Sequence, residues 1–209
     1  MSFSALFDPA CLSCGRTAGG PDRLFCEDCE KRMLSVRPKT KNGVLAALSY
    51  DEPAAKKLVL YMKDHCDRDA FRYSAQLLLH RLLAAGVSPH GYVVTFAPRS
   101  PLSRLVCRFD QSEEIAKALS REIFGDESHC VPLVARSFFS RAQKSLDADA
   151  RAKNMKKHLR LKTGAAVPER IILLDDVTTT GATLERIAQL FYENGAKECL
   201  SLVLAAKQR

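Results

Sequence analysis

The chain has 209 residues, of which 46% are hydrophobic and 27% charged, and 32 Lys and Arg against 24 Asp and Glu give a formal net charge of +8. This composition excludes a disordered, collagenous or disulfide-framework protein and suits one ordinary domain with a small appendage. The longest stretch without a charge, residues 82–98, is broken by glycine and proline and is too short to span a bilayer. The N-terminus lacks a basic region followed by an apolar run, so we expect a cytoplasmic protein with reduced thiols and no membrane insertion.

Four of the eight cysteines form the pattern C-x2-C-x11-C-x2-C near the N-terminus. They are Cys11, Cys14, Cys26 and Cys29. Two residues within each pair allow a tight turn to aim both thiolates at one point, and two such turns supply the tetrahedral shell that Zn2+ accepts. A segment this short buries too little apolar surface to fold alone, so we expect a structural zinc ion that supplies folding free energy. The alternative is that the two C-x2-C pairs occur by chance or serve a redox role.

A domain boundary is predicted just after this module. The segment that follows is basic, contains Pro38 and ends in the turn-forming pair Asn42-Gly43. The chain therefore divides into a zinc-binding module over residues 1–36 and a larger domain over residues 44–209.

The larger domain is predicted to alternate strands with helices. A short strand is followed by two helices whose apolar side chains recur at helical spacing, and then by the first clearly buried strand. The expected strands cover 45–50, 92–97, 130–134, 170–174 and 200–204, and the expected helices cover 52–63, 69–85, 112–124 and 181–194. This order predicts an α/β fold with a mostly parallel twisted sheet and helices on both faces. In such sheets ligands bind beyond the carboxyl ends of the strands.

The strongest local motif is IILLDDVTTTGAT over residues 171–183. A branched apolar strand delivers Asp175 and Asp176, whose carboxylates can accept hydrogen bonds from vicinal ribose hydroxyls. The loop that follows opens a helix, and its backbone N–H groups can bind a phosphate, with Gly181 allowing close approach. The residues expected to hold the phosphate are Thr178, Thr179, Thr180, Gly181, Ala182 and Thr183. The alternative is a capped helix after a strand, but two adjacent carboxylates repel each other, a cost that capping does not require.

The stretch LLDDVTTTGATL resembles the 5-phosphoribosyl 1-diphosphate (PRPP) binding signature of type I phosphoribosyltransferases. More narrowly, the chain resembles the ComF family of competence-associated phosphoribosyltransferase-like proteins over nearly its whole length. The motifs are the four-cysteine module, Pro98-Arg99-Ser100, Phe109-Asp110-Gln111, Arg141-x-Gln143-x-x-Leu146 with Arg151-x-x-Asn154, and the signature itself. Arg108 stands where the family usually has glycine. The resemblance implies a type I phosphoribosyltransferase fold in which Asp175 and Asp176, the catalytic acidic pair, hold the ribose hydroxyls.

By the same resemblance, Arg99 and Ser100 would bind the diphosphate of PRPP, and the segment 136–154 would form a mobile hood over the site. An arginine at a strand end is a charge-assisted donor that suits a diphosphate. The hood residues expected to reach it are Arg141, Gln143 and Lys144. Mg2+ would be held largely by PRPP and water. Because Thr179 stands where 6-oxopurine transferases carry an aspartate, an oxopurine salvage role is disfavoured.

Most of the excess positive charge falls in residues 136–162, which hold nine Lys or Arg and two Asp. This run could recruit PRPP, bind a nucleic-acid backbone or form a merely solvated face. Its only aromatic residues, Phe138 and Phe139, offer little for stacking on bases.

Three functions are consistent with these features. The first is an enzyme that transfers ribose 5-phosphate from Mg-PRPP to an unidentified nitrogen acceptor. The second is an accessory protein of DNA uptake that binds single-stranded DNA or a competence helicase. The third is a PRPP sensor without catalytic activity.

Overall fold

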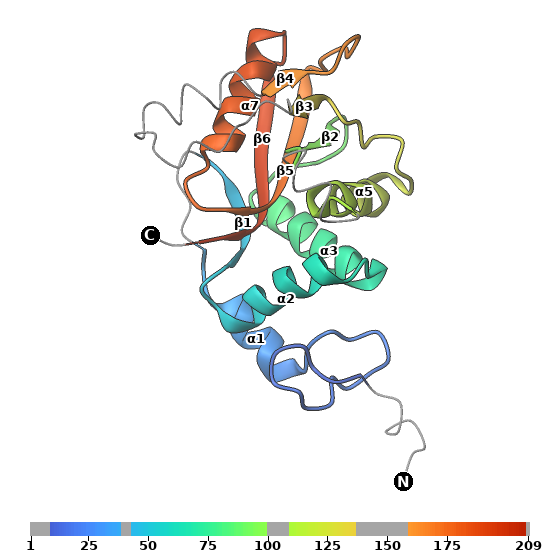
Figure 1. The fold of residues 1–209 in the computed structure, drawn as a ribbon, viewed down its shortest axis with the longest axis vertical. Coiled ribbons are helices and arrows are strands. Elements are labelled where there is room, and N and C mark those ends of the chain that lie inside the picture. Colours follow the sequence, from blue (N-terminus) through green and yellow to red (C-terminus); the bar gives the residue numbers. More distant parts are fainter. Residues whose placement is uncertain (1–8, 39–42, 100–108, 137–158, 208–209) are drawn as a thin grey trace.

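The computed structural model describes residues 9–38, 43–99, 109–136 and 159–207. The described part is built around a four-stranded parallel sheet in the order β1-β6-β5-β2 (Figure 1). Its strands are β1 (Leu45–Ser49), β2 (Val93–Phe96), β5 (Arg170–Thr178) and β6 (Glu198–Ala206). A separate antiparallel pair consists of β3 (Val134–Arg136) and β4 (Leu159–Leu161). The predicted α/β class with a mostly parallel sheet is therefore confirmed.

The helices of the described ranges begin and end at residues suited to those positions. They are α1 (Glu27–Ser35), α2 (Pro53–Asp64), α3 (Arg68–Ala84), α5 (Gln111–Phe124) and α7 (Ala182–Glu193). The Glu52 side chain accepts hydrogen bonds from the first amides of α2, and Pro53 occupies a position where its missing N–H is not needed. Gly125 ends α5 with a φ of +89°. None of the helices in the described ranges is long and apolar enough to cross a bilayer.

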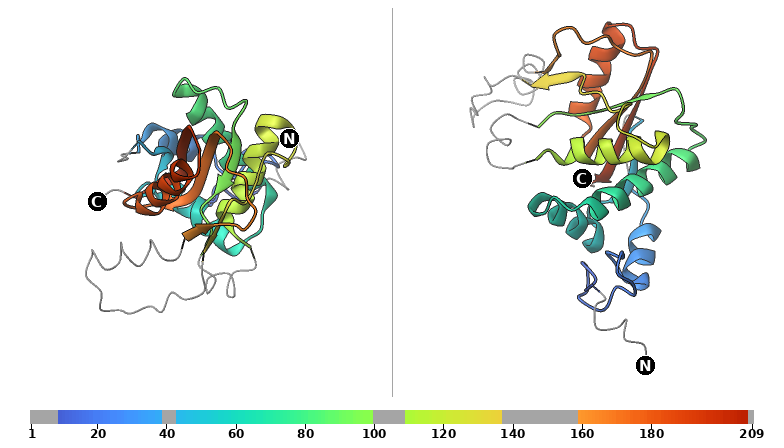
Figure 2. Two further views of the ribbon diagram at one scale, coloured as in Figure 1. Left: turned by 90° about the horizontal axis from the view of Figure 1, so that it is seen from above. Right: turned by 90° about the vertical axis from the view of Figure 1, so that its right-hand side faces the viewer.

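Helices cover both faces of the sheet, with α2, α3 and α5 on one side and α7 on the other (Figure 2). Strand β5 serves both layers, because alternate side chains of a strand point to opposite faces. Ile172 and Leu174 belong to the core beneath α3 and α5, whereas Ile171 and Leu173 belong to the core beneath α7. The uninterrupted apolar run of this strand follows from burial on both faces.

The predicted strand 130–134 is wrong. The segment 130–134 forms only an isolated bridge, between Cys130 and Val94, and regular pairing begins at Val134 with β3. Pro132 lies in the middle of the segment and has no N–H to donate, so a continuous ladder beside β2 is interrupted there.

The cysteine module packs directly on the α/β body. Phe25 and Met33 are buried in the same apolar core as the side chains of α2 and α3. The hydroxyl of Tyr73 on α3 donates to Glu30 Oε1 of α1 over 2.7 Å, and Phe25 and Tyr73 contact each other through their rings. The module therefore contributes apolar surface to the core of the larger domain.

Candidate functional site

The carboxyl ends of β2 and β5, a region called the crevice below, lie where consecutive helices leave the sheet on opposite faces. The chain passes from β2 towards α5 on one face and from β5 into α7 on the other. Such a switch point is where open parallel sheets bind ligands. Pairing of β5 with β2 ends at Leu174 opposite Phe96, whereas pairing with β6 continues to Thr178 opposite Ala206. The last four residues of β5 thus border the crevice.

Asp175 lies half-buried at this crevice and is held by a helix on the neighbouring layer. Its Oδ1 accepts a hydrogen bond from the Ser112 hydroxyl of α5 over 3.0 Å and another from the Asp176 amide over 2.9 Å. Burial raises the pKa of Asp175 well above its ordinary value of 3.8, and the neighbouring charge of Asp176 raises it further. The carboxylate is therefore fixed in place at an energetic cost to the fold.

Asp176 faces the single arginine that the described residues place at this crevice. Its Oδ2 lies 3.7 Å from Arg99 Nη2, and its Oδ1 accepts from the Val177 amide over 2.8 Å. Arg99 also lies 3.9 Å from Asp110 Oδ1, and its backbone amide donates to Asp110 Oδ2 over 3.0 Å. The guanidinium is thus held between two carboxylates, one from each side of the crevice.

Sequence reasoning assigned no role to Asp110, Gln111 or Ser112, and all three are buried at the start of α5. Asp110 caps the helix by accepting from the Ser112 amide over 3.2 Å while it orients Arg99. Gln111 is 1% exposed, and neither polar atom of its side-chain amide has a hydrogen-bond partner among the residues that the structure describes. The available signals were the motif Phe109-Asp110-Gln111 and an aspartate placed to cap a helix, and neither of them reveals a contact with β5.

The predicted phosphate-binding loop joins β5 to α7. Gly181 has a φ of +78°, which favours glycine, and a Cβ there would meet Val44 Cγ2 at 3.5 Å. The Gly181 amide donates to Thr178 Oγ1 over 3.0 Å, and the Ala182 amide donates to Thr180 Oγ1 over 3.4 Å. These amides at the start of a helix suit an anion, which would accept from the amides while the threonine hydroxyls rotate to donate.

The second site is the four-cysteine cluster of the N-terminal module. The four sulfur atoms of Cys11, Cys14, Cys26 and Cys29 all lie within 4.8 Å of one another. Zn–S bonds of roughly 2.3 Å in a tetrahedron set sulfur separations of about 3.8 Å. The Cys14 and Cys26 sulfurs are 3.7 Å apart, so this pair already has the required spacing. The four cysteines are positioned to bind one metal ion.

Arginines surround the cysteine cluster and favour thiolates. Arg16 Nη2 lies 3.8 Å from Cys26 Sγ, and Arg32 Nη2 donates to Cys29 Sγ over 3.3 Å. A hydrogen bond from Arg16 lowers the pKa of Cys14 to about 6, whereas burial raises the pKa of Cys29 to about 11. Metal binding requires all four thiolates, so a cation would supply the remaining driving force for deprotonation of Cys29.

Among the scattered cysteines, Cys130 and Cys199 are part-buried, and burial raises the pKa of each thiol to about 12. Thiols with such values are poor nucleophiles at neutral pH. Cys66 is exposed, and Cys107 lies outside the described residues.

No family model matches the chain. The competence protein ComFC of Streptococcus pneumoniae is 25% identical over 224 aligned positions, which span 95% of this chain and 90% of that protein. This match includes the cysteine module as well as the parallel sheet, and the module carries the four-cysteine cluster. The chain is a ComF-like protein.

A shorter match relates the ComF-like chain to the DNA utilization protein YhgH of Escherichia coli. The two are 35% identical over 91 residues, which span 42% of this chain and 37% of YhgH. The ComF-like chain therefore aligns with little more than a third of that relative.

Solved structures with a related arrangement superpose loosely on the ComF-like chain. A hypoxanthine phosphoribosyl transferase of Trypanosoma cruzi is 12% identical with a TM-score of 0.38, covering 66% of this chain and 64% of that one. The allosteric regulatory enzyme of purine biosynthesis is 21% identical with a TM-score of 0.39, covering 62% of this chain and 25% of that one. The assignment rests on the ComFC match and on the cysteine cluster.

The fold of the ComF-like chain brings three predicted residues, Arg99, Asp175 and Asp176, into one crevice. The predicted loop from Thr178 to Thr183 adjoins them along the chain. The other predicted ligands of the diphosphate, Ser100, Arg141, Gln143 and Lys144, lie outside the described residues, as does most of the basic segment 136–162.

Proposed function

We propose that the ComF-like chain binds Mg-PRPP at the carboxyl ends of β2 and β5 and transfers its ribosyl phosphate to a nitrogen acceptor. The observation that carries the proposal is the pair Asp175 and Asp176 at the end of a buried strand, followed at once by a hydroxyl-rich loop that opens α7. Vicinal hydroxyls on the ribose match two adjacent carboxylates. The 5′-phosphate matches the amides at the helix start.

The described residues support this role through positioning and charge. Ser112 holds Asp175, and Arg99 lies against Asp176, so the acidic pair has a fixed spacing before a ligand arrives. As the bond from the anomeric carbon to the diphosphate breaks, Arg99 is the described cation placed to stabilise the charge on the leaving group. Mg2+ carried by the diphosphate would supply further neutralisation.

The proposed acceptor is a nitrogen that needs no strong base. The loop has Thr179 where 6-oxopurine transferases carry an aspartate, and the hydroxyl of threonine does not accept a proton at neutral pH. Asp175 and Asp176 are assigned to the ribose hydroxyls. A non-catalytic PRPP sensor shares the binding half of this proposal and differs only in turnover.

Calorimetry with Mg-PRPP tests the site. The double variant Asp175→Asn, Asp176→Asn is expected to lose at least about a hundredfold in affinity, since two hydrogen bonds to charged groups weaken together. Asp64→Asn, an exposed change at the end of α2, is the matched control and should bind as the wild type does. Equal affinities for the wild type and the double variant would overturn the assignment.

Release of diphosphate then separates an enzyme from a sensor. Wild-type protein incubated with Mg-PRPP and a panel of amines and nitrogen heterocycles is expected to release diphosphate with at least one of them. Tight PRPP binding without release from any member of the panel would assign the chain as a sensor.

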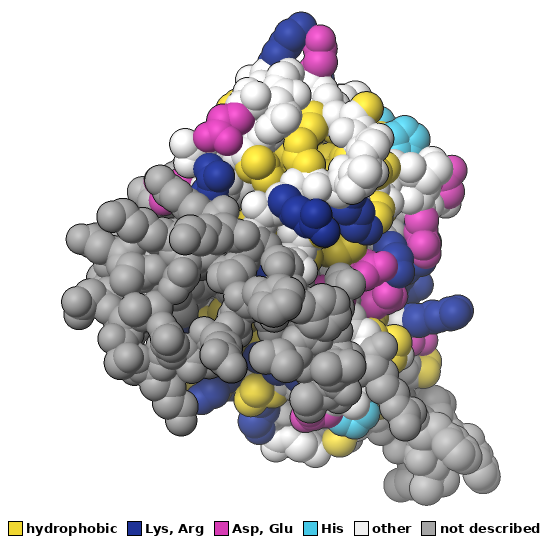
Figure 3. All heavy atoms as spheres, turned by 45° about the horizontal axis from the view of Figure 1, so that its top comes forward, with side chains coloured by type: hydrophobic (Ala, Val, Ile, Leu, Met, Phe, Trp, Pro, Cys, Tyr) yellow, Lys and Arg dark blue, Asp and Glu magenta, His cyan; other side chains and the backbone are white. Residues whose placement is uncertain are grey.

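DNA utilization is the second candidate, because the names of the relatives ComFC and YhgH refer to competence and to DNA utilization. Basic and acidic side chains are interspersed on the face shown in Figure 3, so the described residues in that view present no uniform field to a phosphate backbone. The basic segment 136–162 is where the sequence concentrates its excess positive charge, so it is the segment proposed to contact DNA, and a helicase partner is compatible with it.

Binding of a fluorescent single-stranded oligonucleotide at several salt concentrations tests this candidate. Charge reversal at Lys153, Lys156 and Lys157 should reduce the salt slope by about 0.7 for each phosphate that these lysines neutralise in the wild type. Absence of binding at low salt would remove the DNA candidate and leave the PRPP proposal untouched.

A further inference from the structure

A groove of about 670 Å³ lies between the end of α1, strand β1 and helix α3, away from the crevice that holds Asp175. One complete face of α3 lines it. The residues of this face recur at intervals of three and four, and they are Tyr73, Gln76, Leu77, His80, Arg81 and Ala84. The opposite face of α3, including Leu78 and Leu82, is buried in the core. The groove is thus a helix-length surface that the described part of the fold leaves uncovered.

The walls of this groove are apolar. Leu34 at the end of α1 is 51% exposed and Val36 just beyond it is 36% exposed, and Pro38 and the half-buried Leu77 continue the wall. Single exposed apolar residues are common on protein surfaces, but several that line one concave surface indicate an interaction site.

The charges along the groove have one sign. Among the described residues that line it are Arg37, His80 and Arg81, and none of them is Asp or Glu. Within the described part of the chain, no carboxylate forms an ion pair with any of these three side chains, and Arg81 Nε is buried without a hydrogen-bond partner. Arg37 and Arg81 therefore lack a nearby counter-charge among the described residues, and an anionic group placed in the groove would supply one.

We propose that the groove binds an acidic amphipathic helix of a partner protein. The lining face of α3 runs from Tyr73 to Ala84, which at 1.5 Å per residue is about 16 Å or three helical turns. A helix of that length could lay apolar side chains against Leu34, Val36 and Leu77 while its carboxylates meet Arg37 and Arg81.

The groove suits a protein better than a nucleic acid. Among the described residues that line it, aromatic rings belong to Tyr73, which is half-buried and whose hydroxyl is committed to Glu30 over 2.7 Å, and to the exposed His80. One exposed imidazole offers little for stacking on successive bases. Apolar walls would also leave a phosphate backbone without polar partners along most of its length.

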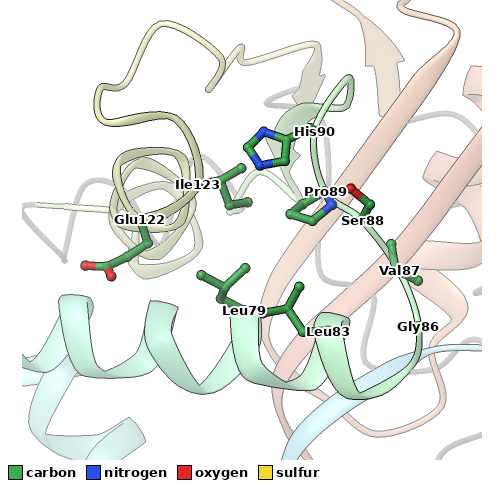
Figure 4. Close-up of a pocket in the computed structure, with 9 residues that line it drawn as sticks. All are labelled: Leu79, Leu83, Gly86, Val87, Ser88, Pro89, His90, Glu122 and Ile123. Carbon is green, nitrogen blue, oxygen red and sulfur yellow. The ribbon is translucent and has the colours of Figure 1, made fainter.

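A neighbouring pocket of about 450 Å³ on α3 provides an internal control. It lies between the end of α3 and the end of α5, and Figure 4 shows Leu79, Leu83 and Ile123 pointing towards one another beneath His90. Glu122 stands on its rim, so this pocket lacks the single-sign charge of the groove.

The test uses the full chain and a synthetic helical peptide of about four turns, with leucines at helical spacing on one face and glutamates on both flanks. Fluorescence anisotropy is expected to show saturable binding with a micromolar dissociation constant. Leu34→Asp and Arg81→Glu should each weaken it at least tenfold. The control substitutions Leu83→Asp and Arg72→Glu, both at exposed positions of α3, should change it less than twofold.

A charge swap makes the result independent of folding defects. A peptide with lysines in place of the glutamates should not bind the wild type and should bind the Arg37→Glu, Arg81→Glu variant. The proposal is overturned if the glutamate peptide fails to saturate at about 1 mM, or if Arg81→Glu leaves its affinity unchanged. If the wild type binds an oligothymidine and Arg81→Glu weakens that binding, the proposal is overturned in favour of nucleic acid. If sedimentation shows that the wild type is a dimer and that Arg81→Glu is a monomer, it is overturned in favour of self-association.

Discussion

Asp175→Asn is expected to stabilise the folded protein while it removes affinity for PRPP. Burial and the adjacent charge of Asp176 both raise the pKa of Asp175, which means that the ionised form is disfavoured in the fold. Asparagine retains an oxygen that can accept from the Ser112 hydroxyl over 3.0 Å and from the Asp176 amide over 2.9 Å. The substitution therefore removes a disfavoured charge and keeps both hydrogen bonds.

The size of the gain follows from two opposing effects. Relieving a destabilised functional site commonly adds about 0.5–2 kcal/mol to the free energy of unfolding. Replacing two charge-assisted hydrogen bonds by neutral ones removes part of that gain. We expect a net increase of about 1 kcal/mol at neutral pH, which for a chain of this size raises the midpoint of thermal unfolding by about 2–4 °C.

The sign of the pH dependence is fixed by the raised pKa of Asp175. Because this pKa is higher in the folded chain than in the unfolded chain, the folded state binds the proton more tightly. The free energy of unfolding of the wild type therefore falls as the pH rises from 3.8 through the folded-state pKa. The variant has no group to titrate there, so its advantage is absent in acid and grows across that window.

Equilibrium urea denaturation followed by circular dichroism, in reducing buffer with zinc, measures the difference at about pH 5 and about pH 8. The variant should have the higher midpoint at the higher pH and a smaller advantage at the lower pH. A lower midpoint for the variant at both pH values, or a difference that does not change with pH, would refute the reasoning.

Three further outcomes are expected. Purified protein should contain about one zinc ion per chain by mass spectrometry, and Cys29→Ser should lose the metal and lower the thermal midpoint by at least about 5 °C. Cys66→Ser, at an exposed position outside the cluster, should do neither. Ser112→Ala should weaken Mg-PRPP binding about tenfold in calorimetry. The substitution deletes the hydroxyl that donates to Asp175 and accepts from the Asp176 amide. Unchanged affinity would contradict the role given to this serine. Arg99→Gln should also weaken Mg-PRPP binding at least tenfold. The control Arg121→Gln, on the exposed side of α5, should leave the affinity unchanged. Equal effects of the two substitutions would argue against a specific role for Arg99.

The buried strands and the metal module could be predicted because their signals are local. The run Ile171 to Leu174 is apolar without interruption because both of its faces are covered, and the cysteine spacing is set by the geometry of a single ion. The extension of β5 to Thr178 was missed because its polar residues read as a loop, whereas continued pairing with β6 keeps them in a strand.

The partners of the acidic pair could not be predicted, since they are distant in the chain. Ser112 lies 63 positions before Asp175, and the two meet only because β2 and β5 are neighbours in the sheet while α5 covers their shared face. The burial of Phe25 and Met33 depends in the same way on helices that follow later in the sequence. Local patterns identify such residues as apolar and leave the surface that covers them undetermined.

The shared core also has a consequence for how the chain is made. The apolar face of the cysteine module, with Phe25 and Met33, is synthesised before α3, the helix that covers it. The four cysteines lie within nineteen positions of one another, so the metal can organise them before the rest of the domain exists. During translation, the apolar face of the module would then be ordered but exposed to solvent until α3 has been synthesised and covers it. Cells short of zinc should accordingly accumulate this protein as aggregates or degradation fragments, even though the four cysteines form no part of the crevice of Asp175.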